Sequence, residues 1–155
     1  VRAVEVIDEY LQRTNAKAEF MHVAMLLPTC PFRTREDIYY AVEKYLKHLD
    51  KPRSLISVTP YDFPPQLALE NKGDDIMYMS EPDSYKTTTR SQSIEQRYHP
   101  NGAIYISSIE QYIKTGTFFQ QFMYAYIMPI ERSFDIDYSY QFKIADMMMK
   151  LVAEN

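Results

Sequence analysis

Two carboxylates placed two residues apart, Asp135 and Asp137, are the sharpest chemical feature of the sequence. In an extended segment, residues at this spacing point to the same side, so the two charges repel unless a cation neutralises them. Magnesium suits such a pair, because it binds one or two carboxylates together with substrate phosphates. A structural alternative explains the same residues: Asp137 or Ser139 only caps the helix that follows, and Asp135 is solvated.

A second candidate site follows an almost unbroken apolar run at 20–27, which predicts a strand buried on both faces, as in a parallel sheet. The turn at 28–34 carries Thr29, which can donate a hydrogen bond, and Arg33, which can bind a phosphate. In open α/β sheets ligands gather at the carboxyl ends of strands, and the N-terminus of the next helix favours anions. A plain strand-to-helix turn accounts for these residues equally well. Cys30 has no base beside it in the sequence, so we do not expect a nucleophile there.

Two further groups of side chains could contact a substrate. The polar stretch 80–100 carries Lys86, Arg90 and Arg97, which either hold an anion or form a solvated face. Phe118 and Phe119 either line an apolar pocket or belong to the core. The three histidines lack the spacing of metal ligands.

The elements that must position these residues alternate between helices and strands. The periodicity predicts helices over 2–14, 108–114 and 139–152, and another that begins after Thr34 with Asp37 completing a capping box. It predicts strands over 20–27, 54–59, 103–107 and 123–128, and a hairpin of 66–70 with 76–79. This order predicts an α/β fold with a mostly parallel sheet and helices on both faces.

Composition narrows the class of protein further. The 155 residues suffice for one domain with one core, and the net charge of −4 argues against a nucleic-acid partner. One cysteine cannot form an internal disulfide, which favours a reducing, cytoplasmic location. No apolar run approaches the roughly 20 residues of a membrane span, and no signal peptide is visible. The chain begins Val1-Arg2 inside an expected helix, so we expect it to be part of a longer protein.

Three blocks of sequence together resemble the acylneuraminate cytidylyltransferases, the CMP-sialic acid synthetases. The first is MLLPTCPFRT at 25–34, similar to the family's strand followed by Pro-Thr-Ser-Pro-Leu-Arg-Thr. The second is PNGAIYI at 100–106, and the third runs from YIMP at 126–129 into SFDID at 133–137. The resemblance covers essentially the whole chain, and it implies a Rossmann-like nucleotidyltransferase fold.

The resemblance also implies a reaction and the residues that carry it. The anomeric hydroxyl of a nine-carbon 2-keto sugar acid attacks the α-phosphate of CTP, pyrophosphate leaves, and a CMP-sugar forms. Asp135 and Asp137 would hold the catalytic Mg²⁺ (or Mn²⁺), and Thr29 and Arg33 would lie at the nucleotide. The residues implied for the sugar acid are Arg90 at its carboxylate, Asn101 and Tyr105 along the sugar, and Phe118 and Phe119 around the N-acyl methyl.

The chain departs from the family pattern in ways that affect the expected activity. Family members open with a strand and an Ala-Arg-x-Gly-Ser loop around the CTP phosphates, and this sequence of only 3 glycines contains no such loop. We therefore expect 1–155 to be the C-terminal portion of a single cytidylyltransferase domain, with little or no turnover alone. Leu27 and Cys30 replace a glutamine and a serine common in the family, which leaves the identity of the sugar acid open.

The family resemblance also predicts how the chain assembles. Family members are homodimers, and the segment 60–100, with its predicted hairpin, would be the inserted dimerisation and substrate segment. The alternative function is that of a catalytically inactive homologue that acts only as a binding or dimerisation module.

Overall fold

The computed structural model describes residues 2–73, 76–81, 83 and 94–153. They form two compact units, one made of Val1–Thr59 with Pro100–Asn155 and the other of Pro60–His99. The second unit has nearly the bounds of the predicted inserted segment, whose role stays a prediction. No helix in the described part of the chain is long and apolar enough to cross a membrane.

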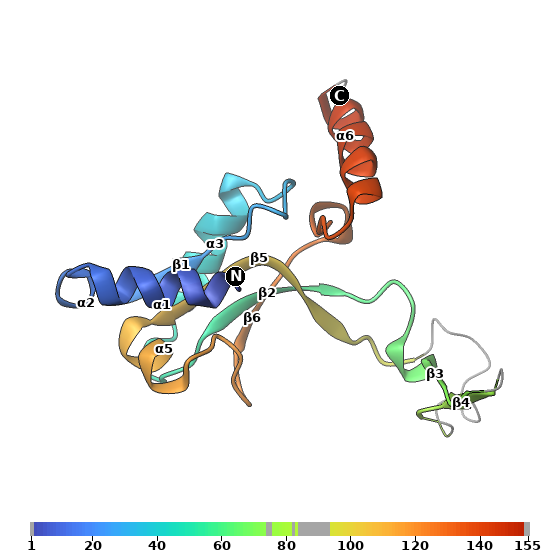
Figure 1. The fold of residues 1–155 in the computed structure, drawn as a ribbon, viewed down its shortest axis with the longest axis horizontal. Coiled ribbons are helices and arrows are strands. Elements are labelled where there is room, and N and C mark those ends of the chain that lie inside the picture. Colours follow the sequence, from blue (N-terminus) through green and yellow to red (C-terminus); the bar gives the residue numbers. More distant parts are fainter. Residues whose placement is uncertain (1, 74–75, 82, 84–93, 154–155) are drawn as a thin grey trace. The chain divides into compact units, whose positions relative to one another are not determined.

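The first unit is built on a four-stranded sheet with the order β1-β5-β2-β6 (Figure 1). Its strands are β1 (His22–Met25), β2 (Leu55–Pro60), β5 (Tyr98–Ser108) and β6 (Tyr124–Ile127). Strands β1 and β5 are antiparallel, with Val23 opposite Ser107, whereas β2 and β6 are parallel, with Ile56 opposite Ala125. The expectation of a mostly parallel sheet is therefore wrong: the sheet is mixed and mostly antiparallel.

The position of β5 explains this correction. A parallel connection needs a crossover of a dozen or more residues, usually a helix, and helix α3 (Arg35–Leu46) supplies one between β1 and β2. After β2 the chain instead turns back on itself, and the Tyr61 backbone N–H donates to the Arg97 carbonyl over 3.0 Å. It then returns as β5 between β1 and β2.

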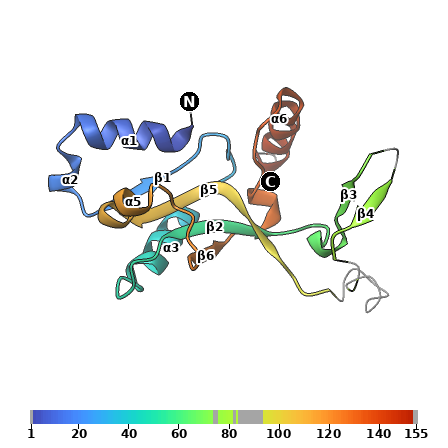
Figure 2. The same cartoon turned by 60° about the horizontal axis from the view of Figure 1, so that its bottom comes forward.

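Helices cover both faces of the sheet, as expected. Figure 2 shows α1 (Ala3–Arg13) and α3 on opposite sides of it. The predicted capping box of α3 is confirmed, because Thr34 Oγ1 accepts from the Asp37 backbone N–H at 3.2 Å. In the C-terminal half of the chain, α5 (Ile109–Thr115) follows β5 and α6 (Ser139–Ala153) follows β6. A short helix, α2 (Ala16–Glu19), precedes β1.

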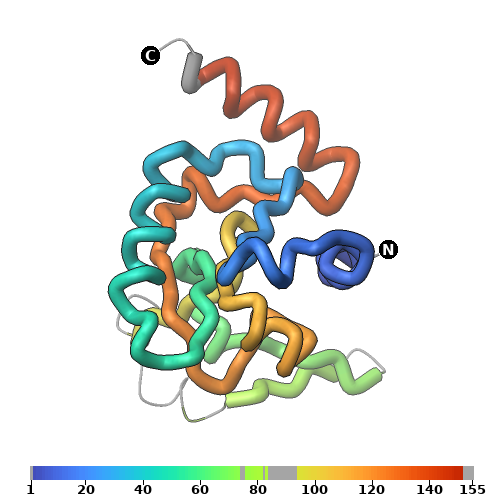
Figure 3. Tube along the Cα trace, turned by 90° about the vertical axis from the view of Figure 1, so that its left-hand side faces the viewer, coloured from blue at the N-terminus to red at the C-terminus, as the bar shows by residue number. Residues whose placement is uncertain are grey.

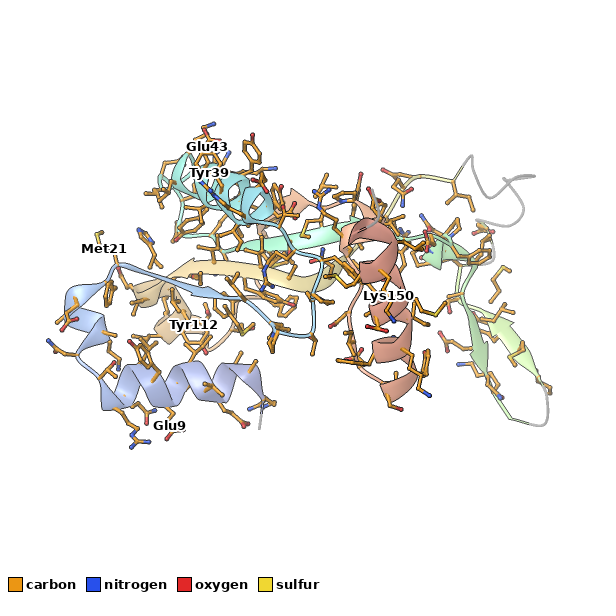
Figure 4. The ribbon with its side chains drawn as sticks, turned by 90° about the horizontal axis from the view of Figure 1, so that it is seen from above. Glu9, Met21, Tyr39, Glu43, Tyr112 and Lys150 are labelled. Carbon is orange, nitrogen blue, oxygen red and sulfur yellow. The ribbon has the colours of Figure 1, made fainter. Side chains whose placement is uncertain are left out.

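Side-chain alternation along the strands divides the core into two clusters. On the α1 side, Ile56, Val58 and Tyr105 pack with Leu11 and Tyr112. Tyr112 lies between α5 and α1, where its hydroxyl donates to Asp8 Oδ1 over 3.0 Å (Figure 4). The cluster on the α3 side consists of Cys30, Ala41, Tyr45, Leu55, Ala103, Ile104, Ile106 and Met128.

Strand β1 is shorter and less buried than the sequence predicted. It begins at His22, and Phe20 and Met21 before it are exposed. The apolar run suggested a strand buried on both faces, but β1 is an edge strand, so its side chains are only partly covered.

The second unit contains the predicted hairpin. Strands β3 (Leu69–Asn71) and β4 (Met77–Met79) are antiparallel, with Leu69 opposite Met79. The unit also includes a 3-10 turn, η1 (Pro65–Leu67). Apolar side chains of the hairpin remain exposed within this chain, among them Leu69 and Ile76.

Candidate active site

Two segments far apart in the sequence meet at the carboxyl end of β1. The turn at 28–34 and the segment at 133–137, which leads from β6 to α6, lie side by side in Figure 3. The Ile136 backbone N–H donates to the Thr29 carbonyl over 3.0 Å. The Cys30 thiol donates to the Asn101 carbonyl at 3.1 Å and lies 3.7 Å from Asp135 Oδ1. The structure thus gathers Thr29, Asn101 and Asp135, which the sequence singled out separately.

Gly102 makes room for this meeting. Its φ is +77°, in the left-handed region that favours glycine. A Cβ at this position would lie 3.1 Å from Cys30 Sγ and 3.3 Å from Asp135 Oδ2. The missing side chain therefore lets β5 approach both groups. No role was predicted for Gly102 from the sequence, although an isolated glycine inside a strand pattern is a signal of such close approach.

Few hydrogen-bond donors among the described residues contact the Asp135 and Asp137 carboxylates. Asp135 is half-buried and Asp137 is exposed, and within the described ranges neither forms an ion pair. The backbone N–H groups of Asp137 and Tyr138 both donate to Gln141 Oε1 over 2.7 Å. Gln141 therefore supplies a side-chain acceptor at the start of α6, and among the described residues no such bond is made by the side chain of Asp137 or Ser139.

Carboxylates are the kind of ligand that a hard divalent cation prefers. No group of three or more possible metal ligands occurs among the described residues. Magnesium needs only one or two protein carboxylates, because substrate phosphates and water complete its shell. Burial and the nearby Asp135 charge raise the pKa of the Cys30 thiol to about 12. Cys30 is accordingly a packing residue with a weak donor.

Asn101 is buried, and both ends of its amide are bonded within the protein. Its Oδ1 accepts from Ser57 Oγ at 2.6 Å, and its Nδ2 donates to Ser133 Oγ at 2.9 Å. Nδ2 also lies 3.2 Å from Met128 Sδ. The side chain therefore ties β2 and β5 to the segment that carries Asp135.

A buried ion pair beside the turn escaped the sequence analysis. Asp37 has no exposed surface, and Arg132 donates to it through Nε over 3.0 Å and through Nη2 over 2.8 Å. Tyr126 donates to Oδ1 over 3.2 Å, and the Thr34 backbone N–H and hydroxyl both donate to Oδ2 over 2.9 Å. Burial alone would raise the pKa of Asp37, but the bonds from Arg132 and Thr34 outweigh it and lower that pKa.

Three aromatic rings form a separate group on the α1 side of the sheet. Tyr105 lies 5.7 Å from Phe118 and 5.9 Å from Phe119, measured between ring centroids. Phe118 is 1% exposed and Phe119 is 51% exposed. Burial raises the pKa of Tyr105, and the nearby Asp135 charge adds to the effect. Of the two phenylalanines, only Phe119 offers substantial surface to a ligand.

The predicted basic residues have different surroundings. Arg33 Nη1 donates to the carbonyls of Leu27 and Ala103 over 3.1 and 2.7 Å, which locks the end of β1 against β5. Its Nε and Nη2 form no hydrogen bond with the described residues. Arg97 pairs with Glu81 through both Nη atoms, at 2.7 and 3.1 Å. Arg90 and Lys86 lie outside the described residues.

The known proteins to which the chain is similar are named as cytidylyltransferases or CMP-sugar acid synthases. The chain is 38% identical to an N-acylneuraminate cytidylyltransferase of Escherichia coli over 128 residues, which are 82% of this chain and 29% of that protein. It is 26% identical to a pseudaminic acid cytidylyltransferase of Campylobacter jejuni over 153 residues, 99% of this chain and 63% of the relative. A CMP-N,N'-diacetyllegionaminic acid synthase of Legionella pneumophila is 27% identical over 96% of this chain and 62% of its own length.

The matches confirm the resemblance drawn from the three sequence blocks. No family model matches the chain. The chain spans less than two thirds of the length of each of these relatives, and under a third of the one from Escherichia coli.

Proposed function

We propose that this chain, a homologue of the acylneuraminate cytidylyltransferases over most of its length, is the metal- and sugar-acid-binding part of an enzyme that joins CTP to a nine-carbon 2-keto sugar acid. The observation that carries the proposal is the meeting of Asp135 with the turn at 28–34 and the start of β5. This arrangement puts a carboxylate without an ion-pair partner among the described residues beside the turn that follows β1, and in open α/β sheets ligands gather at the carboxyl ends of strands.

Each group in the proposed site has a separate task. Asp135 and Asp137 would hold Mg²⁺ or Mn²⁺, which when bound supplies positive charge for the phosphate oxygens of CTP. Thr29 and the remaining guanidinium nitrogens of Arg33 would contact the nucleotide. Arg33 can do so only in part, since its Nη1 already donates to two carbonyls.

The sugar acid is assigned to the aromatic group. Exposed Phe119 would form an apolar wall for the N-acyl methyl, and buried Tyr105, whose ring contacts both Phe119 and Phe118, would support it from the core. Asn101 would be a positioning residue, because the hydrogen bonds of its side-chain amide hold β5 against the segment that carries Asp135. Arg90 would bind the sugar carboxylate through a bidentate guanidinium.

Ligand binding tests the sugar-acid assignment without requiring turnover. We expect saturation-transfer NMR to detect contact of the N-acyl methyl of a sialic, legionaminic or pseudaminic acid with the wild-type chain, and to lose it in Phe119→Ala. Phe20→Ala is the matched control, because Phe20 is 57% exposed and Phe119 is 51% exposed. Equal signals from the two variants would contradict the assignment.

Pyrophosphate release tests the reaction itself. The measurement needs CTP, magnesium and the same panel of sugar acids, first with residues 1–155 and then with a protein that also carries a family phosphate loop. In the complete enzyme we expect Asp135→Asn to lower kcat by orders of magnitude, because a charged metal ligand is lost. Near-normal turnover of that variant at low magnesium would contradict the metal assignment.

The hairpin is assigned to pairing with a second copy of the chain. A two-stranded hairpin is marginal in water, and covering exposed Leu69 and Ile76 would contribute about 1.5–3 kcal/mol each. We expect a dimer in sedimentation analysis that Leu69→Glu dissociates. Leu49→Glu is the control, because Leu49 is 51% exposed in the other unit. A monomer at micromolar concentration would contradict the assignment and favour another occupant for this face.

A further inference from the structure

The Asp37–Arg132 ion pair joins the N-terminus of α3 to the residue that precedes the Ser133–Asp137 segment by one position. Arg132 contacts both carboxylate oxygens of Asp37, and the Asp37 side chain is 0% exposed. Charge-assisted bidentate pairs of this kind fix geometry as well as adding energy. The bond spans 95 residues of sequence, so it reports on tertiary position rather than local turn structure.

The residues after Arg132 are held to the turn at 28–34 and to β5 by weaker contacts. Ser133 Oγ accepts from Asn101 over 2.9 Å, and the Phe134 ring lies edge-on to Phe32 at 6.4 Å. The Ile136 N–H donates to the Thr29 carbonyl over 3.0 Å. Each of these is a single neutral bond or a ring contact, whereas the contact at Arg132 is a double, charged one.

We infer that Arg132 and Asp37 are positioning residues: their ion pair holds the segment 133–137 against Cys30 and thereby sets the place of the two metal-binding carboxylates. The statement about the carboxylates rests on the proposed function. The hold of the ion pair on the segment is independent of that function.

Cys30 provides a direct readout of this positioning. It is the only cysteine of the sequence, it is 2% exposed, and its thiol faces Asn101 and Asp135. Alkylation therefore requires the 133–137 segment or the turn to open. The rate of N-ethylmaleimide reaction under native conditions measures that opening without metal, nucleotide or sugar.

The variants separate positioning from general stability. Arg132→Gln removes the charge, and Arg132→Lys keeps the charge but cannot reproduce the two-pronged contact. Asp37 keeps its bonds from Thr34 and Tyr126 in both variants, so they are expected to fold. Tyr112→Phe is the control, because it removes the bonds to Val4 and Asp8 in the opposite core cluster.

We expect Cys30 alkylation to accelerate at least tenfold in Arg132→Gln and by a smaller factor in Arg132→Lys. In Tyr112→Phe we expect the smallest acceleration of the three variants. Equal acceleration in Arg132→Gln and Tyr112→Phe, with equal melting temperatures, would mean that the pair contributes only general stability and would overturn the inference. Unchanged alkylation in Arg132→Gln would overturn it as well.

Manganese binding, measured by electron paramagnetic resonance, tests whether the ion pair also positions the Asp135 and Asp137 carboxylates. We expect Arg132→Gln to weaken Mn²⁺ binding by about 10–100-fold, as loss of supporting contacts around metal ligands does, and Tyr112→Phe to leave it unchanged. Wild-type protein that binds no Mn²⁺ would refute the proposed metal site, while the alkylation rates would still decide whether the pair holds the segment.

Discussion

Asp37 and Asp135 both lie near the turn at 28–34, but the surroundings of their carboxylates are opposite. Asp37 is fully buried and accepts five hydrogen bonds, two of them from Arg132. Asp135 is half-buried, and within the described residues its side chain is approached only by the weak thiol donor of Cys30. The first carboxylate has its lone pairs occupied by the protein, and the second can still accept a cation. The number of donors around a carboxylate thus separates a structural role from a ligand role.

The largest effect expected from this comparison is a difference in stability between two isosteric variants. Asp37→Asn leaves the partly exposed Arg132 without its counter-ion and loses hydrogen bonds between charged groups, which contribute about 1.5–3 kcal/mol. Asp135→Asn removes no ion pair among the described residues and should change the free energy of unfolding by less than about 1 kcal/mol. Urea titrations followed by circular dichroism give both values. Similar losses in the two variants would remove the distinction between these carboxylates.

A smaller effect is expected from the glycine that lets β5 approach Asp135. Gly102→Ala places a Cβ at a positive φ, which costs about 1–2 kcal/mol, and also against Cys30 and Asp135. Gly116→Ala carries the same kind of strain at a φ of +66°, with nothing within 4 Å. Thermal unfolding should therefore show Gly102→Ala as the less stable variant. If Gly116→Ala melted at the lower temperature, the backbone of the turn and β5 would be able to shift and accommodate the added Cβ at Gly102.

The smallest effect concerns pH. The folded-state pKa of Asp37 is lowered by Arg132 and Thr34 despite burial, so its contribution is complete above the pKa of an unfolded aspartate, about 4. That contribution is lost as the pH falls through the lower folded-state value. Between pH 4 and pH 2 the stability of Asp37→Asn should decline less steeply than that of wild type. Parallel curves for the two proteins would show that another group governs acid unfolding.

Local features of this fold could be predicted from the sequence. The capping box of Thr34 and Asp37, the helices around Leu11 and Tyr112, and the hairpin turn all depend on residues close together in the chain. Their signals are periodicity and short-range hydrogen bonds, which a single sequence displays.

Features that depend on distant residues could not be predicted. The direction of β5 follows from the return of the chain after Tyr61, and no residue within β5 specifies it. The charged partner of Asp37 lies 95 positions away. Asp37 therefore stood out only as a helix cap, although the same carboxylate also anchors the segment that carries Asp135.

The pairing of β1 with β5 has a consequence for how the protein is made. Register partners such as His22 and Ser108 are 86 positions apart, and Met25 and Tyr105 are 80 apart. On the ribosome β1 is complete long before the strand it pairs with has been synthesised, because all of Pro60–His99 comes between them. The apolar run at 20–27 contains no acidic residue, lysine, arginine or proline, so during that interval nothing in it discourages pairing with other nascent chains. The speed of translation across residues 26–108 therefore sets how long β1 remains unpaired, and the demand for chaperones should rise when that stretch is translated slowly.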